Sequence, residues 1–346
     1  MKSCDLRGQG RSLRRAQEAR CESPLHRLST PEGLQDGKSH AALGATVGLA
    51  MQPGHALDSR HGSRLQLTQF SPCYSAAMMR CAAIQFDVRT RDPEWNLETA
   101  VRWIREASER DVKLVVLPEL WPCSFTSELD EGLLRANQDC LTTIEGLSAE
   151  LEIAIAGSAH KPADEPSELP TNRFHVVHQG RSQYSYDKVH LFTPTAEHLA
   201  FRAGELAPPV VEVNDTKLTG LICYDLRFPE LCRAPTRAGA EIMLVSAQWP
   251  VARASHWGVL VRGRAVEGQC FVIATNRTGR SLIGRRKMQL DFPGNSMIAG
   301  PDGDILAEGE GECGLVIADL DLDRVRQLRR RVPVTQDERC DLHASW

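Results

Sequence analysis

The stretch KLTGLICYDLRFPEL (residues 217–231) changes its character halfway along. Leu218–Ile222 is a short apolar run that predicts a buried strand, and a helix is predicted over Phe228–Ala238. Cys223 stands directly after the strand, at the turn between the two elements. A cysteine in such a place is ordinarily a small hydrophobe of the core. Cys223 therefore needs partner residues before any chemistry can be assigned to it.

Apolar runs and helical patterns alternate on both sides of this stretch. Further strands are predicted at residues 81–86, 112–117, 153–157, 242–246 and 270–275, and helices at residues 95–110 and 255–267. Hairpin-like strands are predicted at residues 176–186, turning at Gln179-Gly180, and at residues 296–299, 305–307 and 315–319. A last helix is predicted at residues 322–331, and a loop at residues 280–293, near the pocket or a subunit edge. This order predicts one mixed-sheet α/β domain over residues 78–346.

Residues 1–77 differ in composition from the rest of the chain. They are rich in Arg, Gly, Ser and Pro and lack a sustained helical or strand period. Such a segment buries too little apolar surface to offset its ordering entropy, so we expect a disordered or poorly ordered extension. An organelle-targeting peptide is an alternative, which the acidic residues Asp5 and Glu18 disfavour. Translation from Met78 or Met79 is a third reading.

Charge and cysteine spacing disfavour several classes of protein. The 346-residue chain has a formal net charge of −4, which gives no reason to expect a nucleic-acid or membrane partner. No run approaches the roughly 18–20 apolar residues that cross a bilayer. The 11 cysteines are scattered without a CxxC pair, which argues against a disulfide framework and a zinc site. We therefore expect a cytoplasmic protein without a metal.

Three polar residues follow apolar strands at similar points. Glu119 comes after VKLVVLP, Lys188 after YSYD and Cys223 after KLTGLI. In α/β proteins, this edge of a sheet is where ligands bind. Amide hydrolysis needs a nucleophile, a proton for the leaving amine and positive charge near the oxyanion. Each residue alone is more often structural, but together a thiol, a carboxylate and an ammonium meet these needs.

Three ordered segments resemble the signature motifs of one enzyme superfamily. They are PELW (residues 118–121), DKVHLF (residues 187–192) and ICYDLRFPEL (residues 222–231). They look like those of the nitrilase, or carbon–nitrogen hydrolase, superfamily, and the similarity runs from about Arg80 to the C-terminus. The resemblance implies a four-layer α-β-β-α sandwich with mixed sheets, which pairs into a homodimer or a larger homo-oligomer.

The resemblance also implies a role for each matching residue. Cys223 would be the nucleophile, and Glu119 the general base and acid. Lys188 and the backbone N–H of Tyr224 would stabilise the oxyanion. Glu197, nine residues after Lys188, resembles a second glutamate of the family that positions the others. This chemistry requires no metal and no organic cofactor.

The segments after the nucleophile resemble the omega-amidase branch, which acts on 2-oxoglutaramate and related omega-amides. They include VSAQWP (residues 245–250) and GNSMIAGPDGDILAEG (residues 294–309). A substrate of this kind carries a carboxylate, which a bidentate guanidinium suits, and Arg227 is the candidate. A salt bridge from Arg227 to Asp225 or Glu230 is the structural alternative. Trp249 would wall the pocket or pack in the core.

Two weaker candidates and two alternative functions remain open. Arg202 and Arg277 are weaker candidates for the substrate carboxylate. An N-carbamoyl amino acid or amine amidohydrolase would use the same three catalytic residues and release carbon dioxide as well as ammonia. A non-catalytic binding protein on this fold is the alternative from a different class. A nitrilase proper is disfavoured, because its nucleophile usually stands in CWEN and this chain has CYDLR.

Overall fold

The computed structural model describes residues 78–343 apart from residues 127, 166 and 284–286. The expectations for residues 1–77 lie outside the described residues. Within the described part of the chain, no helix has the length and apolar character that a membrane span needs.

One six-stranded sheet has the strand order β14-β1-β2-β3-β4-β5. Its strands are β1 (Met78–Gln85), β2 (Leu114–Val116), β3 (Ala154–Lys161), β4 (Thr171–His178), β5 (Arg181–Asp187) and β14 (Gly314–Asp321). β1, β2 and β3 pair in parallel, and the other three strands join antiparallel. The hairpin of β4 and β5 turns at Gln179 and Gly180, both at positive φ, so the predicted turn is confirmed.

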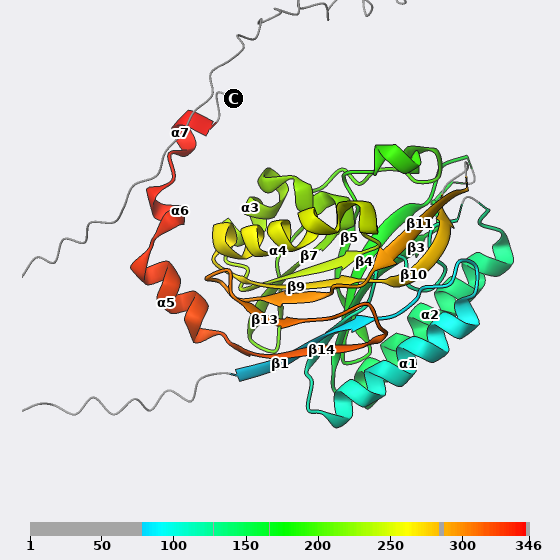
Figure 1. Cartoon of the computed structure of the whole chain (residues 1–346), viewed down its shortest axis with the longest axis horizontal. Helices are drawn as coiled ribbons and strands as arrows, with labels where there is room; N and C mark the ends of the chain where they lie inside the picture. The colour runs from blue at the N-terminus through cyan, green and yellow to red at the C-terminus, as the bar shows by residue number, and fades with distance from the viewer. Residues whose placement is uncertain (1–77, 127, 166, 284–286, 344–346) are drawn as a thin grey trace, which may run out of the picture. The chain divides into compact units, whose positions relative to one another are not determined.

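Two helices cover the outer face of this first sheet (Figure 1). α1 (Pro93–Glu109) begins at Asp92, whose side chain accepts the N–H of Trp95, and α2 (Glu131–Glu150) begins at Asp130 in the same manner. Their apolar stripes pack against the sheet in one core cluster. No helix was predicted over α2, although Cys140, Ile144 and Leu147 follow helical spacing and are buried.

A second six-stranded sheet has the order β13-β12-β9-β8-β7-β6. Its strands are β6 (Val211–Val213), β7 (Thr216–Ile222), β8 (Ile242–Ala247), β9 (Phe271–Asn276), β12 (Met297–Ala299) and β13 (Ile305–Glu308). β7, β8 and β9 pair in parallel, and the others join antiparallel. The helices α3 (Pro229–Arg237) and α4 (Ala254–Gly268) lie on this sheet.

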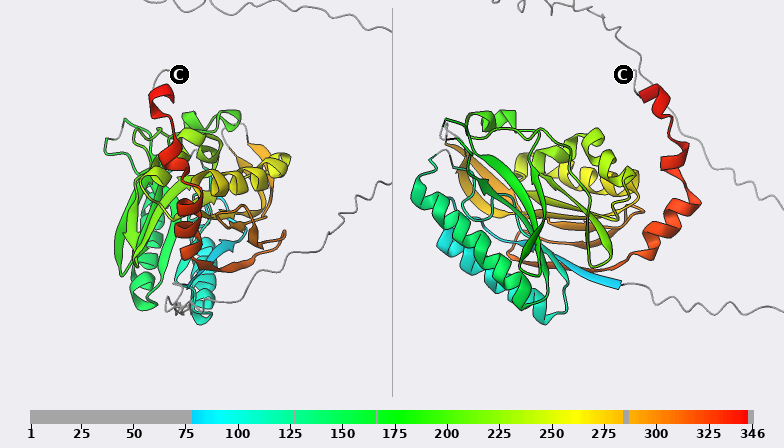
Figure 2. Two further views of the ribbon diagram at one scale, coloured as in Figure 1. Left: turned by 90° about the vertical axis from the view of Figure 1, so that its left-hand side faces the viewer. Right: turned by 180° about the vertical axis from the view of Figure 1, so that it is seen from behind.

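The two sheets face each other, as Figure 2 shows from two sides, and they share one apolar core. Val116 and Phe174 of the first sheet belong to the same cluster as Leu244 and Ile273 of the second. With a helix layer outside each sheet, the molecule is a four-layer α-β-β-α sandwich, and the predicted fold class is confirmed.

Residues predicted as a loop form a hairpin instead. β10 (Thr278–Ile283) and β11 (Met288–Pro293) pair antiparallel from Thr278–Pro293 to Ile283–Met288. The loop prediction was wrong because this segment is rich in polar residues and its apolar residues do not alternate as in a typical strand. Ile283 and Phe292 are buried, whereas Leu282 and Met288 are exposed. The hairpin forms a separate two-stranded sheet beside the two larger ones.

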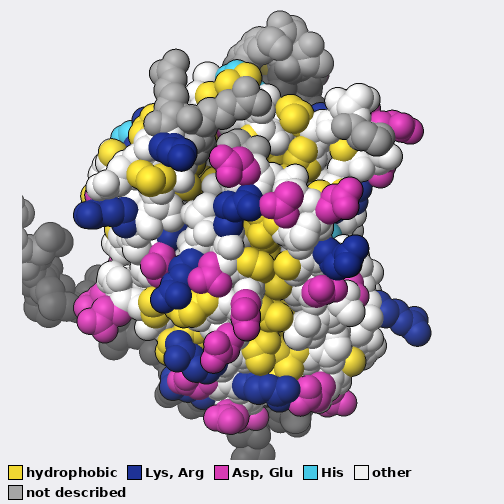
Figure 3. Space-filling model, turned by 90° about the vertical axis from the view of Figure 1, so that its right-hand side faces the viewer, with side chains coloured by type: hydrophobic (Ala, Val, Ile, Leu, Met, Phe, Trp, Pro, Cys, Tyr) yellow, Lys and Arg dark blue, Asp and Glu magenta, His cyan; other side chains and the backbone are white. Residues whose placement is uncertain are grey.

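Short helices follow the last strand. They are α5 (Asp323–Arg331), α6 (Val334–Asp337) and α7 (Cys340–His343), and α5 confirms the predicted helix. Arg329 of α5 donates to the carbonyl of Ala240 at 2.6 Å. This bond ties α5 to the backbone just before β8 of the second sheet. On the face of the molecule in Figure 3, acidic and basic side chains are interspersed.

Side-chain hydrogen bonds join the sheets where β2 and β8 end. Ser246 Oγ donates to the carbonyl of Leu117 at 2.7 Å, and Thr275 Oγ1 donates to the carbonyl of Val116 at 3.0 Å. These bonds connect buried carbonyls at the end of β2 to side chains of the second sheet. They hold together the strand ends that carry the polar residues described next.

Candidate active site

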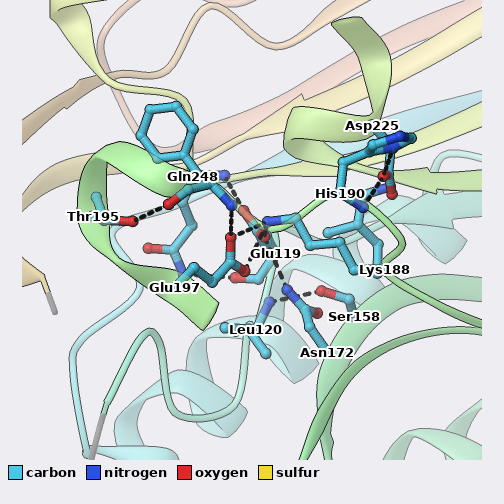
Figure 4. Close-up of polar contacts among 12 residues, drawn as sticks. Glu119, Leu120, Ser158, Asn172, Lys188, His190, Thr195, Glu197, Asp225 and Gln248 are labelled. Atoms are coloured by element: carbon cyan, nitrogen blue, oxygen red, sulfur yellow. Dashed lines mark hydrogen bonds and ion pairs between the residues drawn. The ribbon is translucent and has the colours of Figure 1, made fainter. Parts of the chain in front are cut away.

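Lys188 joins two glutamates in the interior, and Figure 4 shows its ammonium lying between them. Nζ donates to Oε1 of Glu119 at 2.8 Å and to the two carboxylate oxygens of Glu197 at 2.9 and 3.0 Å. Glu119 follows β2, Lys188 follows β5, and Glu197 begins the short 3₁₀ helix η2 (Glu197–Leu199). All three side chains are buried. The structure therefore brings these three predicted residues together.

The two carboxylates keep Lys188 charged. Burial lowers the pKa of Lys188, but the attraction of Glu119 and Glu197 outweighs burial, and the net pKa is raised. Burial raises the pKa of Glu197 against the attraction of Lys188. Glu197 is also held by the backbone N–H of Phe192 at 2.6 Å. The site thus holds a fixed ammonium in a water-poor environment.

Donors from both sheets hold the carboxylate of Glu119. Oε1 accepts from Asn172 Nδ2 at 2.9 Å in addition to Lys188, and Oε2 accepts from the backbone N–H of Gln248 at 3.0 Å. Gln248 Nε2 also donates to the carbonyl of Glu119 at 2.7 Å. The next peptide N–H, of Leu120, donates to Ser158 Oγ at 2.9 Å. Glu119 is therefore fixed in direction as well as in place.

Cys223 begins the 3₁₀ turn η3 (Cys223–Arg227) with a φ of 45°, a left-handed conformation that a side chain rarely adopts. Buried Asp225 anchors this turn to the segment after Lys188. It accepts from the backbone N–H of His190 at 2.9 Å and from the hydroxyl of Tyr186 at 3.0 Å. The turn aims the thiol into the cavity that Glu119 and Lys188 also line.

The thiol of Cys223 needs a base. Burial raises its pKa well above the ordinary value and Glu119 raises it further, while Lys188 and the Gln248 backbone N–H lower it. The resting residue is therefore a thiol, and a thiolate forms only if a neighbour accepts the proton. Glu119 stands close enough to raise this pKa by its charge.

The cavity has the size of a small-molecule site. Its empty volume is about 450 Å³, within the roughly 300–1,000 Å³ usual for such sites. The catalytic candidates share it with aromatic and aliphatic side chains: Phe125, Phe192, Tyr224, Trp249, Ile283, Leu290 and Phe292. Three of these come from the β10–β11 hairpin, so of the two positions considered for residues 280–293 the structure shows the one near the pocket.

Two half-buried arginines line the same cavity. The guanidinium carbon of Arg227 lies 4.7 Å from the ring centroid of Trp249, and that of Arg253 lies 5.2 Å from the ring of Phe192. Arg227 also contacts His256 Nδ1 at 3.0 Å. Within the described residues neither arginine has a carboxylate partner, so the salt bridge considered for Arg227 is absent.

Trp249 serves both functions considered for it, because it is buried and lines the cavity. The weaker arginine candidates lie elsewhere. Arg277 is buried against Asp87 at 2.5 Å, and Arg202 lies 3.9 Å from Glu168 beside a different hollow of the surface. The sequence could not show that Arg227 lines the cavity and that Arg202 and Arg277 do not. Their positions in space depend on how distant segments pair into sheets.

The family model of the carbon–nitrogen hydrolases matches residues 80–330. The chain belongs to the carbon–nitrogen hydrolase family. The family predicted from the three motifs is thereby confirmed, and the protein is a hydrolase of the amidase type. Among residues 78–343 that the structure describes, no group of three or more His, Cys, Asp or Glu side chains is arranged to hold a metal ion.

Relatives with named activities resemble this carbon–nitrogen hydrolase over most of its length. A 2-oxoglutaramate amidase of Bacillus subtilis (strain 168) is 35% identical over 272 residues, which cover 76% of this chain and 98% of that protein. The omega-amidase YafV of Escherichia coli (strain K12) is 32% identical over 243 residues, covering 70% and 90%. The predicted similarity to the omega-amidase branch is confirmed.

Solved structures resemble it as well. An amidase from Nesterenkonia sp. AN1 matches with a TM-score of 0.67 at 30% identity, covering 78% of this chain and 96% of that one. In that structure the acetamide moiety of fluoroacetamide is added covalently at the active site cysteine. A carbon–nitrogen hydrolase from Helicobacter pylori G27 matches with a TM-score of 0.71 at 22% identity, which shows the fold.

Several residues of the site were missed by the sequence analysis. Asn172 and Gln248 hold Glu119, and Arg253 and Phe192 line the cavity. Gln248 and Phe192 lie inside motifs already quoted, so their position was the available signal. Asn172 lies at the start of β4, and its contact with Glu119 depends on the pairing of β3 with β4. Nothing in the local sequence marks it.

Proposed function

We propose that this hydrolase releases ammonia from the terminal amide of a small carboxylate-bearing substrate, with 2-oxoglutaramate as the candidate. One observation carries the proposal. A single cavity is lined by a thiol, a carboxylate and an ammonium, and also by two guanidinium groups that no described carboxylate neutralises. A substrate with an amide at one end and a carboxylate at the other complements this arrangement. The names of the relatives agree with it.

The catalytic cycle begins with proton transfer from Cys223 to Glu119. Oε1 of Glu119 already accepts from Lys188 and Asn172, whereas among the described residues Oε2 accepts only from the Gln248 N–H. Oε2 is therefore the oxygen with capacity for the thiol proton. Sulfur attacks the amide carbon, and the ammonium of Lys188 stabilises the oxyanion together with the backbone N–H of Tyr224.

Glu119 then returns the proton to the leaving nitrogen, and ammonia departs to leave a thioester on Cys223. Water attacks the thioester after giving a proton to Glu119, and the collapse of the second tetrahedral intermediate releases the acid and the thiol. Glu197 positions Lys188 throughout, because it holds two of the contacts of the ammonium. Every proton in this cycle passes through one carboxylate.

Arg227 and Arg253 are proposed to bind the substrate carboxylate. Stacking on Trp249 and Phe192 restricts both guanidinium groups before substrate arrives. Preorganised cations lose less conformational freedom on binding than free side chains. We assign Arg227 and Arg253 to substrate recognition and Trp249 to the wall beneath Arg227.

We also propose that the protein forms a homodimer through α4. Val259 and Val266 of this helix are 71% and 50% exposed, and they lie on its outward side. Apolar side chains exposed on one helix favour contact with another protein surface. Light scattering coupled to size exclusion should give twice the chain mass, and Val259→Glu should lower it. A monomeric wild type at micromolar concentration contradicts this assignment.

The decisive experiment measures ammonia release from 2-oxoglutaramate and from N-carbamoyl-β-alanine by the wild type and by Cys223→Ala. Release from the oxoacid amide that is lost in the variant supports both the substrate and the nucleophile. Release only from the carbamoyl compound, with carbon dioxide, keeps the mechanism and replaces the substrate. Hydrolysis that persists in Cys223→Ala rejects the mechanism. No release from a broad amide panel favours the non-catalytic alternative.

A further inference from the structure

A fully buried arginine beside the cavity has no function in the cycle described above. The side chain of Arg277 is inaccessible to solvent, and burial lowers its pKa to about 10 although Asp87 opposes this effect. Burying a guanidinium is costly unless its donors are satisfied. The contacts of Arg277 therefore indicate the function of its buried charge.

Arg277 holds the side-chain amide of Gln248 in one orientation. Nη1 of Arg277 donates to Oε1 of Gln248 at 3.0 Å, and Ser124 Oγ donates to the same oxygen at 3.2 Å. If the amide flipped, its NH₂ group would face the guanidinium donors. Arg277 thus forces Nε2 of Gln248 toward the carbonyl of Glu119, where it donates at 2.7 Å.

Gln248 in turn controls the reactive oxygen of Glu119. Its backbone N–H donates to Oε2 at 3.0 Å, the oxygen proposed to take the thiol proton, and the same N–H lowers the pKa of Cys223. The Gln248 peptide N–H therefore acts on both the base and the nucleophile. Glu119 follows β2 of the first sheet and Gln248 follows β8 of the second, so this contact aligns the two halves of the site.

We propose that Arg277 is a positioning residue for the general base, acting through Gln248. It keeps Oε2 of Glu119 directed at the Cys223 thiol without touching substrate. This inference rests on the proposed roles of Glu119 and Cys223, but not on the identity of the substrate. A purely structural Arg277 would affect stability and leave the reactivity of the thiol unchanged.

The test is a double-mutant cycle of Arg277→Met and Gln248→Met, with two readouts. One is kcat on the amide that the wild type hydrolyses, and the other is the rate of Cys223 alkylation by iodoacetamide, followed by mass spectrometry. Displacing a catalytic group by a fraction of an ångström to an ångström costs up to about 100-fold. We expect Arg277→Met to lower both rates by about 10- to 100-fold with KM within about threefold.

The coupling between the two substitutions shows whether Arg277 acts through Gln248. If Arg277 acts through Gln248, the double variant should be no more than about threefold slower than Gln248→Met alone. Arg324→Met is the matched control, because it removes an arginine whose contacts are with Asp302, Asp304 and Phe271 rather than with Gln248. It should leave both rates unchanged. Multiplicative effects in the double variant overturn the proposal.

Arg277→Lys covers the case in which Arg277→Met does not fold. A lysine keeps the buried charge for Asp87 but lacks the fork that serves Asp87 and Gln248 together. A folded Arg277→Lys with wild-type alkylation at Cys223 rejects the inference. If no variant, including the wild type, hydrolyses an omega-amide, the proposed substrate fails while alkylation still decides the function of Arg277.

Discussion

The cavity has two regions that handle charge in opposite ways. The floor consists of Glu119, Lys188 and Glu197, all buried, with the ammonium of Lys188 bonded to both carboxylates. The rim consists of Arg227 and Arg253, which are half-buried, lie over aromatic rings and have no carboxylate partner among the described residues. A floor whose charges are paired with one another is suited to moving a proton. A rim whose cations have no carboxylate partner among the described residues is suited to binding an anion. The comparison predicts different consequences for changes in each region.

The largest effect is expected from Glu119→Gln in the floor. The substitution conserves shape and keeps an oxygen for a neighbouring donor, but it removes the only base proposed for the thiol. General acid–base catalysis contributes about 10²- to 10⁴-fold, so kcat should fall by about 10³-fold or more. The loss should be equal for charged and neutral amides. A fall of less than tenfold in a folded variant would show that another group takes the proton.

A smaller and selective effect is expected from Arg227→Met and Arg253→Met in the rim. Hydrogen bonds to charged groups contribute about 1.5–3 kcal/mol, so kcat/KM for a carboxylate-bearing amide should fall by about 10- to 100-fold in each variant. Most of the loss should appear in KM. Butyramide, a neutral amide, should be hydrolysed as by the wild type.

A second probe tests the rim without turnover. Cys223 should react with anionic iodoacetate more slowly in the rim variants, while its reaction with neutral iodoacetamide stays the same. Glu119→Gln should slow both reagents, because it removes the base proposed to take the thiol proton. Equal slowing of both reagents in Arg253→Met would place this arginine with the floor, and the distinction between the two regions would fail.

The residues of the floor were predicted from the sequence more completely than the residues that hold them in place. Glu119 and Lys188 of the floor and the nucleophile Cys223 stand in local motifs, and each follows a strand that fixes its place at a sheet edge. Asn172 and Arg277 act on the floor through strand pairing and sheet packing between distant segments. No local pattern encodes such contacts. For the same reason Arg277 was a candidate for substrate binding, although the fold buries it behind Gln248.

The elements show the same division. α1 and the parallel strands carry a clear period and were predicted, whereas α2 was missed although its spacing was present. The β10–β11 hairpin was predicted as a loop because its strands belong to neither large sheet, and one side faces the cavity. A pattern shaped by a cavity does not show the regular alternation of a strand packed on a core.

The smallest effect on catalysis is expected behind the floor, at His160 on β3. This residue is paired across the strands with Asn172 and stacks on Phe201, and neither ring nitrogen has a hydrogen-bond partner in the described part of the chain. Burial lowers the pKa of His160 from 6.5 to about 3. The unfolded chain therefore takes up a proton below pH 6.5 that the folded chain refuses until about pH 3. The free energy of unfolding must decrease as the pH falls through this window.

His160→Phe should remove this residue's share of the pH dependence. One such group contributes about 1.4 kcal/mol per pH unit, so the variant should gain about 2 kcal/mol on the wild type between pH 7.5 and pH 5 in urea titrations. His175, with a pKa lowered to about 4 by burial, keeps part of the slope in both proteins. An unchanged difference between the two pH values would mean that His160 takes up its proton in the folded state as readily as in the unfolded chain. The floor would then have a second cation behind Asn172, and its charge balance would no longer rest on Lys188 alone.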